Sequence, residues 1–513
     1  MKKQSLIKGT FILGIAGIIA KFLGLFFRFP LVMLIGDNGI GYYQMSYPLY
    51  TFFIAAASGI PVAVSKMVSE RNAVGDRNGI ILILRKAILL MAVLGGGFTV
   101  FLLIFSRELV RFLNWDSHAL YSLMGIAFAP LFISIVSPLR GFFQGLQNMT
   151  PTAISQILEQ IGRVIVGVGL AYMLLNRGVE YSAGGAAFGA TFGAIMAGIY
   201  LFFKYIKAQK QLGKVKVKND SSILTKIICI AIPVSLGSAV GSIMSLLDSI
   251  LVPQNLLRAG FDYRQATELY GQLTGKAFVL VNVPLTLSMA LCISIVPMIS
   301  EAFILNKRFE LVNKVDTALK MSMIIAIPSF LGLFFMANPI MRLIFPGHSS
   351  GSYILRYLSI SIPFIILFQA TTAILQGIGK YLLPVINLFI GCVIKVFITI
   401  HFVPVANINV YGAVIGTIAG YFVATMLNVI VFTVKLKIKP KYYDILIKPA
   451  YASIIMIIGV VIIYTYVYNK TMNNIISCGV SVLLGVIVYS MLIVVFGIFS
   501  YGDIKRRIVK KYR

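Results

Sequence analysis

The chain has 513 residues, of which 59% are hydrophobic and only 12% are charged, and its 45 Lys and Arg against 16 Asp and Glu give a formal net charge of +29. Because soluble globular proteins contain about 25% charged residues, this composition excludes an ordinary water-exposed surface and indicates a membrane protein. A transmembrane β-barrel is excluded as well, since the apolar runs lack the alternation that lipid-facing strands require.

Fourteen apolar runs follow one another along the chain, and a run of about 20 apolar residues crosses a bilayer as an α-helix. The first run contains Lys21 and Arg28 and is too long for the apolar core of a signal peptide, so we expect a retained helix. No segment between the runs is long enough for a soluble domain, which predicts an all-α polytopic membrane protein. The predicted helices cover residues 8–35, 43–69, 82–105, 119–142, 152–175, 184–206, 224–251, 272–300, 317–338, 352–377, 382–402, 411–434, 446–468 and 475–499.

Lys and Arg are distributed unevenly between the two sides of these helices. With the N-terminus inside, the cytoplasmic segments hold 30 of them and the external loops hold 8. Since basic loops stay cytoplasmic, we expect a multi-pass protein of the bacterial plasma membrane with both termini in the cytoplasm. The lysines between 204 and 218 and the basic tail from Lys505 then determine topology and meet anionic lipid headgroups, so the net charge requires no nucleic acid.

The sequence resembles itself at an offset near 230 residues, which indicates a duplication. Because the offset spans six helices, an even number, the two copies form a parallel repeat. We therefore expect an N-lobe in residues 1–210 (helices 1–6), a C-lobe in residues 211–440 (helices 7–12), and helices 13 and 14 with the basic tail in residues 441–513. Small residues four apart let helices approach closely, so the matching glycines predict packing contacts. The matches are Gly185-Ala186-x-x-Gly189-x-x-x-Gly193 with Gly412-Ala413-x-x-Gly416-x-x-x-Gly420, Gln144-Gly145 with Gln376-Gly377, Arg163-Val164 with Lys395-Val396, and Ser69-Glu70 with Ser300-Glu301.

Charged residues inside the predicted helices point to function, because each costs roughly 2.5 to 3.5 kcal/mol at the bilayer centre on insertion scales. Lys66 and Arg140 lie near cytoplasmic ends, where long side chains reach the interface. Glu159 precedes Arg163 by four residues, an order that predicts an ion pair. The other candidates are Lys21 and Arg28 in helix 1, Asp248 in helix 7, Lys276 at the outer end of helix 8 and Lys395 in helix 11.

Three of these cations lack an acidic partner in the sequence. Asp248 lies at a depth where Lys276 can neutralise it, whereas Lys21, Arg28 and Lys395 have no such neighbour. Together they cost about 8 to 10 kcal/mol on the same scale. They predict at least a water-filled cavity, and an anionic substrate is the sharper interpretation.

Catalytic signatures are missing from the sequence. Gly377-Ile378-Gly379-Lys380 has neither the spacing nor the hydroxyl of a nucleotide-binding loop. His118, His348 and His401 stand far apart, and no metal site with the cysteines is predicted. We expect a transporter without catalytic residues, cofactor or metal rather than an enzyme.

Several sequence blocks that run through most of the first 300 residues resemble one family. The blocks are Lys8-Gly9-Thr10, Lys21-Phe22-Leu23-Gly24 with Arg28, Gly59-Ile60-Pro61-Val62-Ala63-Val64-Ser65-Lys66, Leu139-Arg140-Gly141-Phe142-Phe143-Gln144-Gly145 with Gln147-Asn148-Met149, Ser155-Gln156-x-Leu158-Glu159-Gln160, Tyr270-Gly271-x-Leu273-Thr274-Gly275, and Val296-Pro297-x-Ile299-Ser300-Glu301. With the six-plus-six repeat, they are similar to the stage V sporulation protein B and polysaccharide-biosynthesis (MurJ-like) branch of the multidrug/oligosaccharidyl-lipid/polysaccharide flippase superfamily.

The resemblance implies two lobes that open alternately to each side of the membrane, with helices 1, 2, 7 and 8 lining the cavity. In the related lipid II flippases, basic residues of helices 1, 2 and 8 hold the substrate diphosphate, and helices 13 and 14 form a groove for the lipid tail. Lys21, Arg28 and Lys276 match those cations in helix and approximate depth. The predicted substrate site is therefore Lys21, Arg28, Asp248 and Lys276, with Lys66, Glu159, Arg163 and Lys395 as secondary candidates.

This chain departs from the lipid II flippases in helix 2. Tyr50-Thr51-Phe52-Phe53 stands where those flippases have a mid-helix arginine, and Tyr42-Tyr43-Gln44 replaces an acidic residue at the outer start. The departure makes lipid II a weaker expectation than a lipid-linked oligosaccharide in general.

The expected function is translocation, by alternating access, of an undecaprenyl-diphosphate-linked saccharide of the lipid II type for spore cortex or cell wall. The alternatives are export of another lipid-linked unit for capsule or teichuronic acid, cation-coupled multidrug export, and a scaffold or glycan polymerase. Drug exporters of this superfamily use acidic intramembrane residues, whereas basic ones prevail here seven to two. For a polymerase, only residues 253–271, with Asp262 and Glu268, offer an external acid. The expected partners are the lipid-linked oligosaccharide, membrane lipids and peptidoglycan polymerases.

Overall fold

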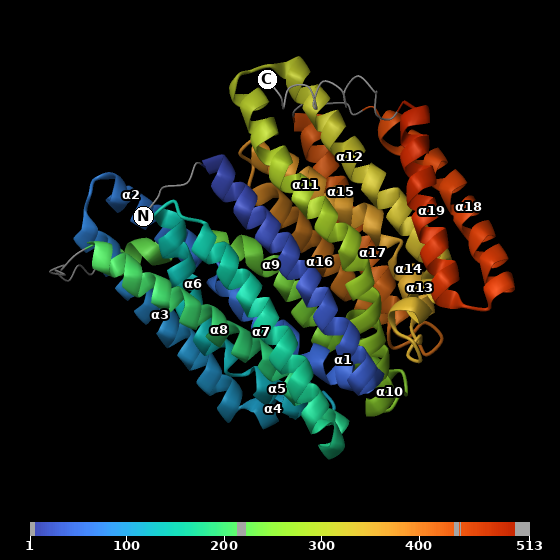
Figure 1. Cartoon of the computed structure of the whole chain (residues 1–513), viewed down its shortest axis with the longest axis horizontal. Helices are drawn as coiled ribbons and strands as arrows, with labels where there is room; N and C mark the ends of the chain where they lie inside the picture. The colour runs from blue at the N-terminus through green and yellow to red at the C-terminus, as the bar shows by residue number, and fades with distance from the viewer. Residues whose placement is uncertain (1–5, 213–221, 436–440, 442, 498–513) are drawn as a thin grey trace. The chain divides into compact units, whose positions relative to one another are not determined.

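The computed structural model describes residues 6–212, 222–435, 441 and 443–497, and every regular element within these ranges is a helix (Figure 1). Twelve of the described helices are long and apolar enough to cross a membrane, and the bent pair Ser352–Leu358 and Ser361–Gly377 makes a thirteenth span. The first span, Ile12–Ala73, has 62 residues, about three times what one crossing needs, and it contains two predicted helices. Each of the fourteen predicted runs therefore overlaps a described span, and the polytopic all-α fold is confirmed.

The break predicted between residues 35 and 43 is present as a kink at which two helical segments meet within α1 (Leu6–Ala57). The helix turns at Gly36, whose φ of 63° and ψ of −166° are not helical. Glycine adopts this conformation without the steric penalty that a Cβ brings. The predicted second helix continues after a second break at Ser58 as α2 (Gly59–Ala73).

Contacts divide the chain into two compact units, Met1–Gly275 and Lys276–Arg513. The lobes predicted from the sequence duplication have a different boundary, after residue 210. Their limits stay a prediction. Besides α1 and α2, the first unit holds α3 (Arg77–Ile104), α4 (Ser106–Phe112), α5 (Ala119–Ile126), α6 (Ala129–Gly145), α7 (Thr150–Leu174), the 3₁₀ turn Leu175–Arg177, α8 (Val179–Leu212), α9 (Ser222–Arg258) and α10 (Tyr263–Gly271).

The second unit follows the short π-helix Gln272–Ala277, which contains the limit between the units. It holds α11 (Phe278–Ile304), α12 (Arg308–Phe335), α13 (Ala337–Ile344), α14 (Ser352–Leu358), α15 (Ser361–Gly377), α16 (Leu382–Phe402), α17 (Tyr411–Ile430), the π-helices Val431–Lys435 and Tyr443–Ile447, α18 (Lys448–Thr471) and α19 (Asn474–Val495).

The helix bounds repeat as the sequence predicted. α3 and α12 both have 28 residues, with their first residues, Arg77 and Arg308, 231 positions apart. α6 and α15 both have 17 residues and begin 232 positions apart. Even the left-handed residues recur, since Gly75 and Asn306 both have positive φ just before the paired helices. The duplication is therefore visible in the backbone of each unit.

The repeated glycines lie where two helices touch, as expected of small residues four apart. A Cβ on Gly189 of α8 would lie 2.8 Å from the carbonyl oxygen of Arg163 in α7, and a Cβ on Gly416 of α17 would lie 3.0 Å from that of Lys395 in α16. Arg163 and Lys395 are themselves a repeat pair. The same helix–helix contact is thus built twice, and the packing role of the glycines is confirmed.

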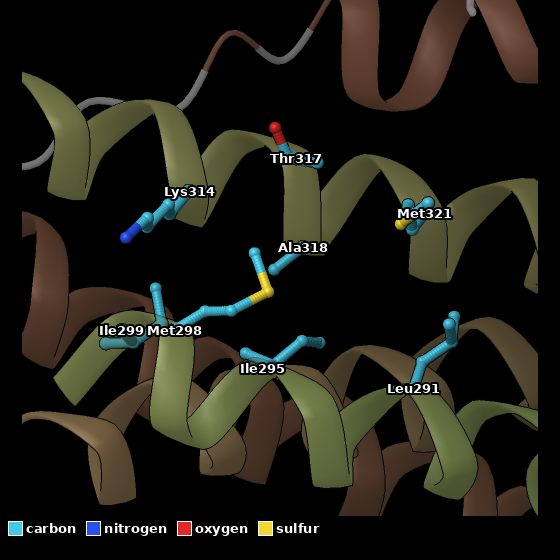
Figure 2. Close-up of a pocket in the computed structure, with 8 residues that line it drawn as sticks. All are labelled: Leu291, Ile295, Met298, Ile299, Lys314, Thr317, Ala318 and Met321. Carbon is cyan, nitrogen blue, oxygen red and sulfur yellow. The ribbon is translucent and has the colours of Figure 1, made fainter. Parts of the chain in front are cut away.

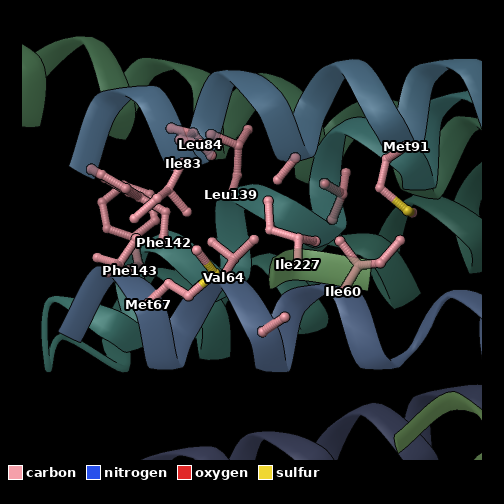
Figure 3. Packing of buried hydrophobic residues seen from close by; sticks show 14 of the residues in the cluster. Ile60, Val64, Met67, Ile83, Leu84, Met91, Leu139, Phe142, Phe143 and Ile227 are labelled. Carbon is pink, nitrogen blue, oxygen red and sulfur yellow. The ribbon is translucent and has the colours of Figure 1, made fainter. Parts of the chain in front are cut away.

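Each unit has an apolar core. In the first, α2, α3 and α6 meet the start of α9, with Ile60, Val64, Ile83, Phe142 and Ile227 packed together (Figure 3). In the second, α18 and α19 lie side by side (Figure 1) and pack on α12 and α13, a contact reinforced by hydrogen bonds from Tyr489 to the Ile324 carbonyl (2.9 Å) and from Asn474 to the Pro339 carbonyl (3.0 Å). Of the predicted topology determinants, residues 214–218 and the tail from 505 lie outside the described residues.

Candidate functional site

Arg28 lies against two tyrosines from its own helix, beyond the bend. Its guanidinium carbon is 5.4 Å from the ring centroid of Tyr43 and 5.7 Å from that of Tyr47. Arg28 and Tyr43 are 15 positions apart, about 22 Å along a straight α-helix. The bend at Gly36 brings the two segments of α1 together, so this contact depends on one glycine.

Tyr43 and Tyr47 form a stacked pair on one face of α1, with ring centroids 5.4 Å apart and an interplanar angle of 21°. Tyr50 continues the row, 5.9 Å from Tyr47. Tyr43 and Tyr50 are fully buried, and the hydroxyl of Tyr50 has no hydrogen-bond partner among the described residues. From the sequence, Tyr43 and Tyr50 are identified only as part of a departure from a family pattern, and Tyr47 is not identified. Their spacing of four and three residues is the signal that would have found them.

Arg163 of α7 approaches Tyr47 as well. Its Nη1 donates a 3.1 Å hydrogen bond to the Tyr47 hydroxyl, and its guanidinium carbon lies 5.7 Å from the same ring centroid. The predicted pair with Glu159 is present, at 3.7 Å between Nη2 and Oε1. Arg163 and Glu159 are both buried, so the pair lies inside the helix bundle of the first unit.

Glu159 has a nearer partner than the one four residues along its helix. Arg140 of α6 donates from Nη2 to Glu159 at 2.9 Å and from Nε to the Ser155 hydroxyl at 2.9 Å. The prediction that Arg140 extends to the interface is therefore wrong. The side chain turns inward because a buried carboxylate needs a partner and Arg presents a rigid set of donors. We name Arg28, Tyr43, Tyr47, Arg140, Glu159 and Arg163 the arginine–tyrosine cluster; three guanidiniums against one carboxylate give it a net charge of +2.

Lys276 is fully buried and held within the second unit. Its ammonium lies 2.7 Å from the carbonyl oxygen of His348, 3.1 Å from that of Ser350 and 3.0 Å from the Ser350 hydroxyl. Three acceptors match the three hydrogens of an ammonium. Lys276 therefore links the end of the π-helix before α11 to the segment between α13 and α14.

The remaining predicted residues differ in their burial. Lys21 and Lys66 are exposed, and Asp248 on α9 is half-buried. Lys395 is buried on α16, where its Cγ would lie 3.4 Å from a Cβ on Gly416. Its aliphatic stem therefore fills the contact with α17.

A cavity of about 130 Å³ lies between α11 and α12 in the second unit (Figure 2). Its walls are almost wholly apolar, and the one charged group, Lys314, lies 2.8 Å from Glu310 and 3.4 Å from Glu301. A saccharide headgroup needs convergent polar groups, so this cavity is not suited to one. The lining residues are Leu291, Ile295, Met298, Ile299, Lys314, Thr317, Ala318 and Met321.

The sequence profile described as "Polysaccharide biosynthesis protein" matches residues 6–303, more than half of the chain. The chain belongs to this family. The match includes all of α1, α2, α6 and α7, so the whole arginine–tyrosine cluster lies within the family region. As a member with twelve or more described spans, the protein is a multi-pass membrane protein.

Two relatives of known name are similar to this chain over most of their length. Stage V sporulation protein B of Bacillus subtilis (strain 168) is 29% identical, over 99% of this chain and 98% of that protein. Lipid II flippase MurJ of the same organism is 27% identical, over 82% of this chain and 81% of that protein.

Solved structures share the fold. A lipid II flippase MurJ in an inward closed conformation has a TM-score of 0.72 at 17% identity and covers 96% of this chain and 99% of that one. An inward-facing multidrug transporter of the MATE family, from the MOP superfamily, has a TM-score of 0.68 at 16% identity and covers 82% of this chain and 94% of that one. The helical architecture of this chain is therefore one that both kinds of transporter share.

Proposed function

We propose that this protein translocates an undecaprenyl-diphosphate-linked saccharide across the bacterial plasma membrane by alternating access. The proposed substrate is a lipid II-type peptidoglycan precursor for spore cortex or cell wall. Membership of a polysaccharide biosynthesis family and similarity to a named lipid II flippase support this class. The proposed orientation, with both termini in the cytoplasm, rests on the 30 to 8 distribution of basic residues.

The observation that carries the proposal is the cationic character of the helix interior around Arg28. Its Nη1 is buried without a hydrogen-bond partner among the described residues, and the surrounding cluster has a net charge of +2. A diphosphate offers several acceptor oxygens, and charge-assisted hydrogen bonds are about twice as strong as neutral ones. We propose Lys21 and Arg28 as the headgroup ligands. The assignment of Lys276 and Asp248 to the same site stays a prediction from the sequence.

The test is reconstitution of the full chain in proteoliposomes with fluorescently labelled lipid II. A quencher added outside the vesicles reaches only the label in the outer leaflet. The wild-type protein should therefore increase the fraction of labelled lipid that is quenched, and the Lys21→Ala/Arg28→Ala variant should not. Lys207→Ala is the matched control, since Lys207 is an exposed lysine of the same unit outside the predicted site. If wild-type protein moves neither lipid II nor undecaprenyl diphosphate carrying other sugars, the proposed function is wrong. Movement of a cationic drug instead would favour the exporter alternative.

A further inference from the structure

One tyrosine ring in the first unit is shared by two guanidiniums. Arg28 of α1 and Arg163 of α7 each place the guanidinium carbon 5.7 Å from the ring centroid of Tyr47. The two cations thus cannot be farther apart than twice that distance. Like charges so placed repel each other, and the negative face of an aromatic ring offsets this repulsion only in part.

The two guanidiniums are held to different degrees. Arg163 donates to the Tyr47 hydroxyl at 3.1 Å and pairs with Glu159, which Arg140 holds in turn at 2.9 Å. Its side chain is only 9% exposed. Arg28 is half-buried and rests on the Tyr43 and Tyr47 rings, and its Nη1 has no hydrogen-bond partner among the described residues. Arg163 is held by a hydrogen bond and an ion pair, although its Nε has no partner among the described residues, whereas Arg28 rests on two rings with its Nη1 unbonded.

A series of contacts links Arg140 and Glu159 to Arg28, and each contact orients the next side chain. Arg140 and Glu159 orient Arg163, Arg163 orients the ring of Tyr47 through its hydroxyl, and Tyr47 stacked on Tyr43 fixes the plane against which Arg28 lies. A guanidinium whose plane is fixed presents two donors to a phosphate without losing further rotational freedom.

We propose that Tyr47 and Arg163 are positioning residues for headgroup recognition: they set the orientation in which Arg28 meets a phosphate oxygen of the lipid diphosphate. This inference rests on the proposed function. Arg163 then affects substrate affinity through Tyr47 and Arg28 rather than by contact with the substrate. A purely structural role, in which the cluster only braces α1 against α7, predicts a loss of stability and no specific loss of affinity.

The experiment measures binding of undecaprenyl diphosphate without sugar to the full-length protein in nanodiscs, so that it depends neither on transport nor on the saccharide. Tyr47→Phe keeps the ring and removes only the hydroxyl that Arg163 holds. We expect about fivefold weaker binding, the size of one hydrogen bond, with only a small fall in the thermal unfolding temperature from the same lost hydrogen bond. Tyr121→Phe is the matched control, because it removes a tyrosine hydroxyl bonded to Tyr181 at 3.2 Å in the same unit.

A double-mutant cycle separates positioning from bracing. If Tyr47 acts through Arg28, Tyr47→Phe should not weaken binding further in the Arg28→Ala background. Arg163→Lys should lower affinity like Tyr47→Phe in the wild-type background and have no effect in the Arg28→Ala background. A full fivefold loss that persists without Arg28, or a loss of stability in place of affinity, would overturn the inference. If wild-type protein does not bind the lipid diphosphate at all, the proposed function fails with it.

Discussion

The two copies of the repeated helix trio have the same backbone contacts and different buried chemistry. In the first unit, α6, α7 and α8 bury Arg140, Glu159 and Arg163 in an ionic network. In the second, α15, α16 and α17 bury a neutral one, in which Asn387 donates to Asn428 at 2.8 Å and Asn428 donates to Thr371 at 3.1 Å.

Position by position, the contrast is sharper. Residues 232 positions after Arg140, Ser155, Glu159 and Arg163 are Thr372, Asn387, Gly391 and Lys395. A Cβ on Gly193 would meet the carbonyl of Glu159, and a Cβ on Gly420 would lie 2.7 Å from that of Gly391, the equivalent residue. Glycines at the helix contact maintain the scaffold through backbone approach, so the side chains beside them are free to diverge. The duplication therefore preserved the packing, while the Arg140–Glu159–Arg163 network belongs to the first copy and the second copy retains a buried cation, Lys395.

The largest expected effect tests whether transport depends on the cations of the first unit. Replacing both Lys21 and Arg28 by Ala removes two charge-assisted contacts, each worth about 1.5 to 3 kcal/mol, so lipid flipping should fall by about 100-fold or more. Lys395→Gln, in the second copy, should lower it by less than about fivefold. Labelled-lipid flipping in proteoliposomes at matched protein level measures both. Equal losses for the two variants would contradict this division.

A smaller effect is expected on the stability of the ionic network. Glu159→Gln leaves Arg140 and Arg163 without their shared carboxylate, which should lower the free energy of unfolding by about 3 to 5 kcal/mol. Glu108→Gln, at an exposed position, should change it by less than about 0.5 kcal/mol. Unfolding in detergent micelles, followed by circular dichroism, measures the difference. An unchanged free energy of unfolding for Glu159→Gln would mean that the ionic network does not stabilise the packing of α6 and α7.

The shared scaffold predicts parallel effects in both copies. Ala at Gly189 or Gly416 places a Cβ 2.8 Å or 3.0 Å from a facing carbonyl oxygen, and such crowding costs about 1 to 3 kcal/mol. Gly189→Ala should be the more destabilising, because its contact is the shorter. Gly169→Ala in α7 is the control, since a Cβ there meets nothing within 4 Å. Thermal unfolding compares the three; a Gly169→Ala variant as unstable as the others would rule out the contact as the cause.

The smallest effect is expected from the neutral network. Asn428→Ala removes the partner of Asn387 and the donors to Thr371 and Thr372, and the loss should be about 1 to 2 kcal/mol. Adding Asn387→Ala should cost little more, because both changes break one network. Chemical unfolding of the single and double variants measures this. Additive losses would show that the two amides act separately.

Much of the architecture follows from the sequence, because a helix that crosses a bilayer has a length and an apolar composition that can be counted. The fourteen apolar runs, the repeat at an offset near 230 and the packing glycines all appear in the structure. The Glu159–Arg163 pair was predictable too, since both residues lie on one helix at a fixed spacing.

The cluster around Arg28 was decided only by the tertiary structure. The contact between Arg28 and Tyr43 depends on the bend at Gly36, and the bonds from Arg140 to Glu159 and from Arg163 to Tyr47 join different helices. Lys276 likewise finds its acceptors 72 and 74 residues away. A sequence shows which charges must be compensated inside a membrane. The packing of the helices decides which partner compensates each charge. The local spacing of residues in the sequence does not predict it.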